Sequence, residues 1–306
     1  MKKVSIIGAG NVGSTLAFTL IDLNVDIVLV DIDKDKTNAM ALDISEASTL
    51  GNYVNIKLSS DYEDIKNSDI VVVTAGIPRR PGMSRDDLLL KNAGIVSSVT
   101  KNIKEHAPKS IIIVVSNPLD AMVYTALKVS GFDTSKVMGM AGILDSARMN
   151  YFVRQELPNA KDVKSVVLGG HGDSMVPIIS KCTVDGRSLD EVLDSDIISK
   201  VVSSTQNGGK QIVELLKTGS AYYAPAKSVS LMVESILLDQ NKVLPVAIYL
   251  NEYKSVSGVL VKLGKNGISE EIKLDLTPSE KQGFDHSISK VTELIEVLQR
   301  DFFGKD

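Results

Sequence analysis

Cysteine is nearly absent from this chain of 306 residues, in which Cys182 stands alone. A single cysteine excludes an intrachain disulfide and fits a protein that works in a reducing compartment. Cys182 closes an apolar stretch that starts at Ile178, so buried packing is its expected role. From this cysteine usage we predict a cytoplasmic protein.

Long hydrophobic runs and an excess of one charge are also missing. No apolar run approaches the roughly 20 residues that a membrane-spanning helix needs. The formal net charge is −4 and no long block of Lys or Arg occurs, which argues against a nucleic-acid surface. The run Val4 to Ile7 is short and ends in a glycine turn, so it is typical of a strand rather than of a signal peptide. No Cys/His/Asp cluster has metal-ligand spacing, and we predict no bound metal.

Apolar runs alternate with helical patterns through the first half of the chain. The strand-like runs are Val4 to Ile7, Ile27 to Val30, the weaker Asn55 to Leu58, Ile70 to Val73 and Ile111 to Val115. Unbroken apolar strands separated by helices predict a doubly wound parallel sheet covered on both faces. The alternation fades after Ala141-Gly142, and the length suits two domains. We therefore predict an α/β domain over 1–143 and an α+β domain over 144–306.

A glycine-rich turn joins the first strand to the first helix. Gly8 to Gly13 reads G-x-G-x-x-G, and Asp31 follows the second strand 18 positions after Gly13 (31 − 13). A dinucleotide-binding site is indicated when such a glycine pattern lies between a strand and a helix and an acidic residue follows the next strand. Gly8 would allow the tight turn, Gly10 the approach of a pyrophosphate, and Gly13 the packing of helix on strand. Asp31 would bind the ribose diol and repel a 2′-phosphate, which favours NAD over NADP; the alternative is a tight turn with a surface aspartate.

A loop with three arginines follows the strand that ends at Val73. Prolines and glycines interrupt the segment Gly76 to Asp87, which carries Arg79, Arg80 and Arg85. Taken alone, it is more often a solvated basic turn than an anion clamp. The carboxyl ends of parallel strands share one edge of the sheet, however, and this loop leaves from that edge. The same edge would hold Thr74, Ala75, Gly76, Ser116 and Asn117.

The end of this loop carries a helix-capping signal. Ser84 and Asp87 have the spacing of a capping box, which puts Arg85 in the first helical turn. The helix dipole disfavours a cation there by about 0.3–1 kcal/mol. A residue that breaks a local rule is a candidate functional residue, although this cost is small.

One histidine in the second half has a setting that suggests chemistry. His171 lies between Gly170 and Gly172, which remove side-chain bulk around the imidazole, whereas His106 and His286 are expected to face solvent. Upstream, Asp145 and Arg148 are three residues apart and so share one face of a predicted helix. The alternative for that pair is an ordinary intrahelical ion pair.

The remainder of the chain gives structural rather than chemical signals. We predict helical blocks at about 189–216 and 226–238 and a strand at 243–249. A hairpin over 258–274 should turn at Gly264 to Gly267. A last helix over 278–302 has an apolar stripe that indicates core or subunit contact.

These motifs together resemble the lactate/malate dehydrogenase family, in its order and over nearly the whole chain. The segments that carry the resemblance are Gly8 to Gly13, Gly76 to Asp87, Val115 to Pro118, Leu144 to Arg148 and Gly169 to Asp173. One departure is visible: the stretch from Tyr253 to Gly267 is shorter than usual and lacks the expected Gly-Val-Pro segment. The resemblance implies a Rossmann-type NAD-binding domain, a substrate-binding/catalytic domain, and a homodimer or homotetramer.

The resemblance also implies roles for single residues. His171 would be the acid/base, with Asp145 fixing its tautomer, and Arg148 would bind the C1 carboxylate of the substrate. Arg85 would polarise the C2 carbonyl, and Asn117 would bond the C2 oxygen. The implied cofactor contacts are Gly8, Ala9, Gly10, Asn11, Val12, Gly13, Asp31, Thr74, Ala75, Gly76, Asn92, Val115, Ser116 and Asn117.

Arg79 would decide the substrate. The lactate-specific relatives carry a neutral glutamine at this position, whereas a guanidinium would pair with the second carboxylate of malate or oxaloacetate. We therefore expect NAD-dependent oxidation of malate. The closest rival is a lactate or other 2-hydroxyacid dehydrogenase, and a rival from another class is a module that binds NAD without turnover. Arg80 has no expected role beyond a solvated charge.

Overall fold

The computed structural model describes residues 1–78 and 82–304. Six parallel strands form one half of the central sheet, in the order β3-β2-β1-β4-β5-β6. Their bounds are β1 Lys3–Ile7, β2 Asp26–Val30, β3 Ile56–Ser59, β4 Ile70–Val73, β5 Ile111–Val114 and β6 Val137–Gly139. The predicted parallel sheet is confirmed, with strand ends displaced by a residue in places.

The same sheet continues into the second half of the chain. Strand β12 pairs antiparallel with β6 through Ala247 and Gly139, and β13, β8 and β9 follow, with β14 also on β13. The bounds are β8 Val167–Gly169, β9 Met175–Pro177, β12 Lys242–Leu250, β13 Ser255–Gly264 and β14 Gly267–Ile272. The predicted hairpin is confirmed, with its turn at Lys265-Asn266. The two halves therefore share one continuous sheet.

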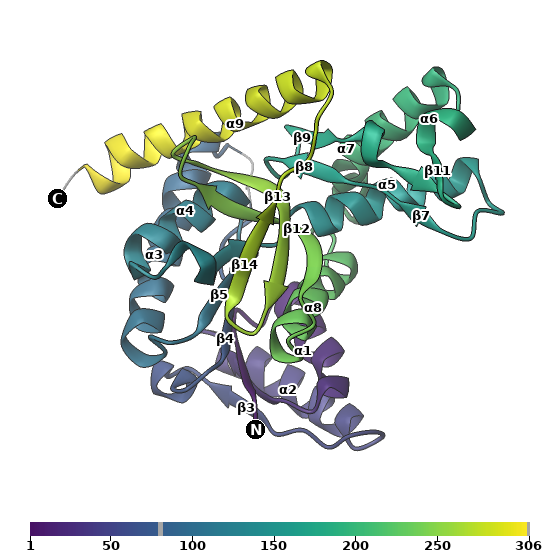
Figure 1. Cartoon of the computed structure of the whole chain (residues 1–306). Coiled ribbons are helices and arrows are strands. Elements are labelled where there is room, and N and C mark those ends of the chain that lie inside the picture. Colours follow the sequence, from purple (N-terminus) through teal and green to yellow (C-terminus); the bar gives the residue numbers. More distant parts are fainter. Residues whose placement is uncertain (79–81, 305–306) are drawn as a thin grey trace.

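Helices cover both faces of this sheet (Figure 1). One apolar cluster joins α1 (Asn11–Leu20), α2 (Lys34–Ser48) and α8 (Tyr223–Leu237) to one face. The other joins α3 (Arg85–His106), α4 (Leu119–Ser130) and α9 (Pro278–Leu298) to the opposite face. Neighbouring strand residues alternate between the faces, as Ile6 and Ile7 do. The stripe of the last helix is core, since Ile288, Val291, Ile295 and Leu298 are buried.

A smaller lobe projects beside the sheet, at the upper right of Figure 1. It contains α5 (Gly142–Glu156), α6 (Leu189–Val192), α7 (Ser195–Leu216) and a sheet of β7 (Val163–Lys164), β10 (Thr183–Val184) and β11 (Arg187–Ser188). The segment from Val163 to Gly169 is divided between the two sheets, as β7 and β8. The strand is interrupted at Ser165, because its N–H donates to the Asn150 side chain and not to a neighbouring strand. Cys182 is buried in this lobe, as predicted.

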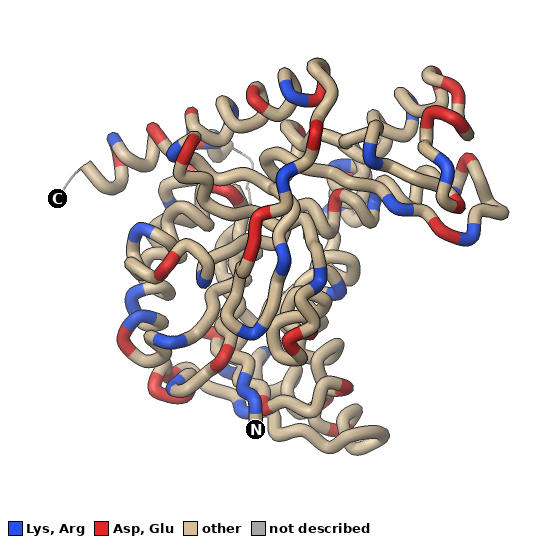
Figure 2. Tube along the Cα trace, viewed as in Figure 1, with Lys and Arg blue, Asp and Glu red and all other residues tan. Residues whose placement is uncertain are grey.

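Residues of both charge signs are interspersed along the chain, as the tube in Figure 2 shows. This distribution fits the small net charge of −4. Within residues 1–78 and 82–304, no helix combines the length and the apolar character needed to cross a bilayer.

Candidate active site

The loop after β8 holds the backbone of His171 next to α4 and α9. Gly169 has φ +84° and Gly172 has φ +101°, a region where side chains are strained, so glycine suits both turns. The Gly170 N–H donates to Ser287 Oγ on α9 (2.8 Å), and the His171 N–H donates to Asp120 Oδ2 on α4 (2.9 Å). Two helices that lie far apart in the sequence therefore hold this loop.

Asp145 links the imidazole to an arginine. His171 Nδ1 lies 2.9 Å from Asp145 Oδ2, and Arg148 Nη1 lies 3.2 Å from Asp145 Oδ1. An ionised carboxylate only accepts hydrogen bonds, so Nδ1 carries the hydrogen and Nε2 stays available. The Asp145 side chain is 2% exposed, and those of His171 and Arg148 are 14% and 16% exposed. The intrahelical ion pair that the spacing allowed does form, but it is buried and shared with a histidine from another element.

The charges around His171 decide its proton affinity. Burial alone would lower the pKa of the imidazole, because the charged form is desolvated. The charge and hydrogen bond of Asp145, and the charge of Asp120, act the other way, while the Arg148 guanidinium opposes them. The net result is a His171 pKa above its usual 6.5. The surrounding carboxylates therefore favour the protonated imidazole over the neutral one.

The glycine turn forms a narrow cradle at the carboxyl edge of the parallel strands. Gly8 has φ +110°, and its carbonyl oxygen would lie 1.9 Å from a Cβ at Gly13, so only glycine fits there. Gly10 caps α1 without any side-chain hydrogen bond, which leaves the helix start open for an anion. Asp31 reaches the turn, because its Oδ2 accepts from the Ala9 N–H (2.6 Å). An uncapped helix start beside one carboxylate fits a dinucleotide whose ribose carries no 2′-phosphate.

Polar side chains tie the neighbouring strand ends together. Thr74 Oγ1 donates to the Gly8 carbonyl (3.0 Å), and Ser116 Oγ donates to the Ala75 carbonyl (2.6 Å). The buried Asn92 amide donates to the carbonyls of Ile77 (3.1 Å) and Asn117 (2.7 Å) and accepts from the Ile77 N–H (2.9 Å). Asn92 therefore fixes the backbone at this edge, and any help that it gives to a cofactor is indirect. The cofactor-edge residues that keep an exposed face are Asn11, Gly76 and Asn117.

Comparisons with known proteins identify the family. Residues 2–139 match the lactate/malate dehydrogenase NAD binding domain, and residues 143–300 match the lactate/malate dehydrogenase alpha/beta C-terminal domain. The chain belongs to the lactate/malate dehydrogenase family. It is 52% identical to a malate dehydrogenase of Aliarcobacter butzleri over 99% of both chains.

Solved structures of the family have the same fold. The malate dehydrogenase of Picrophilus torridus, solved in its apo form, has a TM-score of 0.96 at 41% identity, over 100% of this chain and 99% of that one. A lactate dehydrogenase of Cryptosporidium parvum, complexed with lactic acid and the cofactor NAD, has a TM-score of 0.93 at 38% identity, over 97% and 98%. Family members of both specificities thus share this fold, so the fold alone does not select a substrate.

The structure describes only part of the arginine loop, namely residues 76–78 and 82–87. The predicted capping box is confirmed: Ser84 Oγ accepts from the Asp87 N–H (3.0 Å), and Asp87 Oδ2 accepts from the Ser84 N–H (3.1 Å). Arg85 begins α3 and is exposed, and its charge acts on Glu293 of α9. Among the described residues, no hydrogen bond or ion pair joins Arg85 to His171, Asp145 or Arg148. Arg79 and Arg80 lie outside the described residues.

Two glycines that were not predicted as part of the site lie next to Arg148. Gly208 and Gly209 lie inside α7, and a Cβ at Gly209 would meet the Arg148 guanidinium at 3.4 Å. Glycine inside a helix costs about 1 kcal/mol relative to alanine, so a pair of them in a helical block was a usable signal. Their bare backbone leaves room beside the guanidinium.

The other histidines behave differently from each other. His286 is exposed, as expected. His106 is not, because its side chain is 17% exposed and its Nδ1 lies 3.3 Å from Glu63 Oε1. The expectation of solvent exposure was wrong for His106, since Glu63 approaches from a segment 43 residues away (106 − 63) that sequence pattern could not place.

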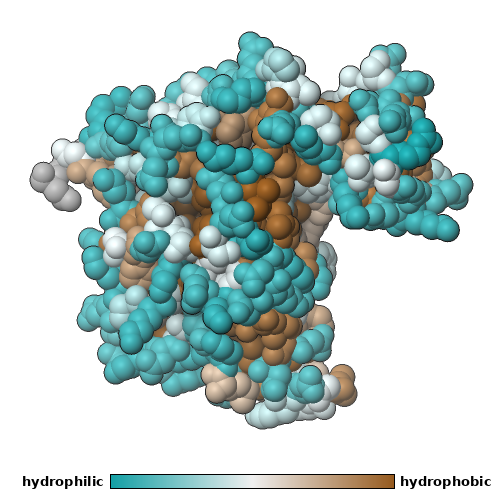
Figure 3. Space-filling view, viewed as in Figure 1, coloured by the Kyte–Doolittle hydropathy of each residue, from teal (hydrophilic) through white to brown (hydrophobic). Residues whose placement is uncertain are grey.

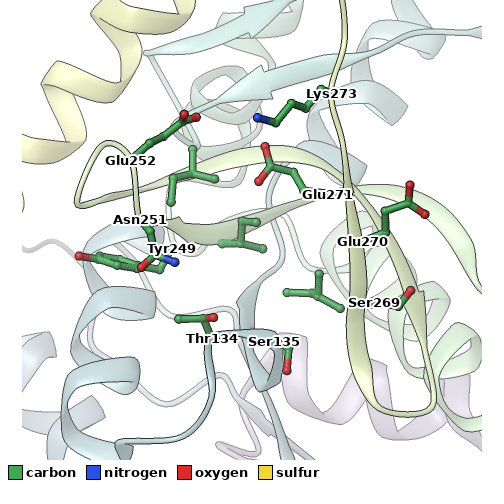
Figure 4. Close-up of a pocket in the computed structure, with 12 residues that line it drawn as sticks. Thr134, Ser135, Tyr249, Asn251, Glu252, Ser269, Glu270, Glu271 and Lys273 are labelled. Atoms are coloured by element: carbon green, nitrogen blue, oxygen red, sulfur yellow. The ribbon is translucent and has the colours of Figure 1, made fainter.

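The cavity in Figure 4 lies elsewhere, between β12, β14 and the turn at Thr134-Ser135. It measures about 360 Å³ and is lined by Glu252, Glu270 and Glu271, with Lys273 as its cation. The excess of carboxylates makes it unsuitable for an anionic substrate. Within the described part of the chain, no group of three or more His, Cys, Asp or Glu could hold a metal ion.

Proposed function

We propose that this chain catalyses the reversible NAD-dependent oxidation of (S)-malate to oxaloacetate. The observation that carries the proposal is the buried Asp145 carboxylate, which holds His171 at 2.9 Å and Arg148 at 3.2 Å. A relative with 52% identity that is named malate dehydrogenase supports this substrate. NAD, when bound, supplies the acceptor for the hydride that leaves C2 of malate.

His171 moves the proton in this proposal. Its Nε2 takes the hydroxyl proton of malate and returns it to the oxygen in the reverse direction. Asp145 keeps the imidazole in the required tautomer and stabilises the imidazolium. The raised pKa of His171 extends the acid form, which reduction needs, to higher pH than in a free histidine. Malate oxidation needs the neutral form and should increase as pH rises through that pKa.

Arginines bind and polarise the substrate. Arg148 would bind the C1 carboxylate through a bidentate pair of hydrogen bonds that lysine cannot reproduce. Arg85 would stabilise the charge that grows on the C2 oxygen, and Asn117 would bond the same oxygen. Arg85 is exposed at the start of α3, so closure of the site over the substrate would be needed to exclude water from it.

The glycine cradle is proposed to hold NAD. The open start of α1 would bind the pyrophosphate through backbone N–H groups, and Asp31 would bind the ribose diol. The side chains of Thr74, Asn92 and Ser116 would keep the neighbouring strand ends in place. A cytoplasmic location, which the single cysteine favours, stays a prediction.

The substrate assignment is tested by a paired assay with NADH and two keto acids. We expect faster turnover of oxaloacetate than of pyruvate at equal concentration, because pyruvate leaves a desolvated arginine unpaired, at a cost on the order of 3–5 kcal/mol. The measurement is NADH oxidation at 340 nm with each keto acid. Faster turnover of pyruvate would overturn the malate assignment.

Arg79→Gln is the matched variant for this assay. It should cut oxaloacetate activity sharply and spare pyruvate activity, because glutamine removes the unpaired charge. Arg80→Gln is the control, since Arg80 has no proposed contact. Equal losses on both keto acids in Arg79→Gln would show that Arg79 does not select the substrate.

We also propose that the chain forms a homodimer or homotetramer. Phe18 of α1, Leu42 of α2 and Tyr223 of α8 are 51%, 64% and 70% exposed. Phe18 and Tyr223 line one shallow hollow, and Figure 3 shows apolar surface over α1. Apolar patches of this kind mark contact surfaces.

Light scattering of the unsubstituted protein should give a mass of two or four times 32.9 kDa. The variant Phe18→Glu should have a lower mass, because a charge is placed in the contact surface. A monomeric mass of the unsubstituted protein would contradict the proposal.

A further inference from the structure

Asp120 is a buried carboxyl group that the mechanism above does not use. It lies in the first turn of α4, is 5% exposed, and accepts the His171 N–H through Oδ2 at 2.9 Å. Its other oxygen, Oδ1, is buried and has no hydrogen-bond partner within the described residues. An unpartnered buried carboxylate oxygen is unfavourable, so this side chain is not explained by stability alone.

A neutral side chain would hold the loop equally well. One residue earlier, the Gly170 N–H donates to the hydroxyl oxygen of Ser287 at 2.8 Å, and that hydroxyl is buried without any charge. The chain thus uses two different acceptors for two adjacent N–H groups of one loop. The property that Asp120 adds and Ser287 does not is a negative charge close to the acid/base histidine.

Asp120 and His171 influence each other's proton affinity through their charges. Burial raises the pKa of Asp120 to about 6, with the Asp145 charge in the same direction and His171 in the opposite one. The Asp120 charge in turn favours the protonated imidazole, together with Asp145 and against Arg148. From α9, the groups next to Gly170 are the uncharged Ser287 and Val291. His171 therefore lies within reach of two carboxyl groups, on α4 and on α5.

We infer that Asp120 is a positioning residue for His171, which holds its backbone N–H and supplies a second negative charge that favours the imidazolium. This inference rests on the proposed function, in which His171 is the acid/base. Removing the charge while keeping an acceptor should make the imidazole easier to deprotonate. The neutral form, which malate oxidation needs, should then persist to lower pH.

The test compares Asp120→Asn with the matched control Ser287→Ala. For each enzyme, kcat/KM for malate is measured from pH 6 to pH 9 at saturating NAD. In Asp120→Asn we expect the ratio of the pH 6 value to the pH 9 value to rise at least about threefold. Ser287→Ala removes the neighbouring hydrogen bond but no charge, so its rate can fall while this ratio stays constant. An unchanged ratio in Asp120→Asn, or an equal rise in Ser287→Ala, would overturn the inference.

A spectroscopic titration separates this inference from the proposed function. The chain has three histidines, so the His171 imidazole signal can be assigned by its loss in His171→Asn. In the unsubstituted protein without substrate, the His171 signal should show a second inflection near pH 6 from Asp120. The inflection should disappear in Asp120→Asn. A single inflection in the unsubstituted protein sinks the inference even if the variant does not fold, whereas lack of malate turnover with two inflections sinks only the proposed function.

Discussion

His171→Asn is expected to lower kcat for malate oxidation by about 10²–10⁴-fold, with NAD binding retained. The imidazole is the proposed proton acceptor, and asparagine can keep a hydrogen bond to Asp145 but cannot take up a proton. Steady-state kinetics with malate and fluorescence titration with NADH measure the two effects separately. The loss should be largest for the chemical step and small for the cofactor.

The control for this experiment is His286→Asn, which makes the same change at an exposed site. It should leave kcat close to that of the unsubstituted enzyme. The experiment also addresses the rival in which the chain senses NAD without turnover. If the unsubstituted protein turns over neither malate nor lactate, and His171→Asn weakens NADH binding, the sensor would be the better description.

Arg148→Lys is expected to lower kcat/KM for malate by roughly 10²-fold or more. A hydrogen bond to a charged group contributes about 1.5–3 kcal/mol, and lysine cannot replace both arms of the guanidinium. Because lysine keeps the positive charge near Asp145, the loss should come mainly from substrate binding and therefore as a raised KM. The measurement is initial rate against malate concentration at saturating NAD.

The same helix offers a matched control. Arg154 of α5 donates to the carbonyls of Ala160 (2.6 Å) and Lys161 (3.1 Å) in the exposed turn that follows the helix. Arg154→Lys changes the same chemical group on the same element without touching Asp145, so KM should stay constant. If Arg148→Lys and Arg154→Lys gave the same KM, Arg148 would have no part in carboxylate binding.

The features of the candidate site that depend on residues close together in the sequence were predictable from the sequence. The glycine turn, the Ser84 capping box and the shared face of Asp145 and Arg148 each depend on residues a few positions apart. Their spacing fixes the geometry through helix periodicity and turn conformation. The hairpin turn before Gly267 was predictable for the same reason.

Contacts between distant segments were not predictable in this way. Asp120 lies at a helix start, where an acidic residue is ordinary, and so gave no sign that it accepts from His171, 51 residues away. The Asn92 amide was expected to help hold a cofactor, but its N–H groups are used by Ile77 and Asn117. The pairing of His106 with Glu63 was missed as well.

For this protein, the sequence by itself determined the order of strands and helices, the family resemblance and the residue types of the site. Those properties follow from local propensity, periodicity and short motifs. Only the tertiary structure decided that one continuous sheet joins the two halves, and that α4, α5 and α9 meet at the loop of His171. The physical reason is that the proton affinity of a histidine depends on the charges around it in space, and these come from elements whose packing no local pattern specifies.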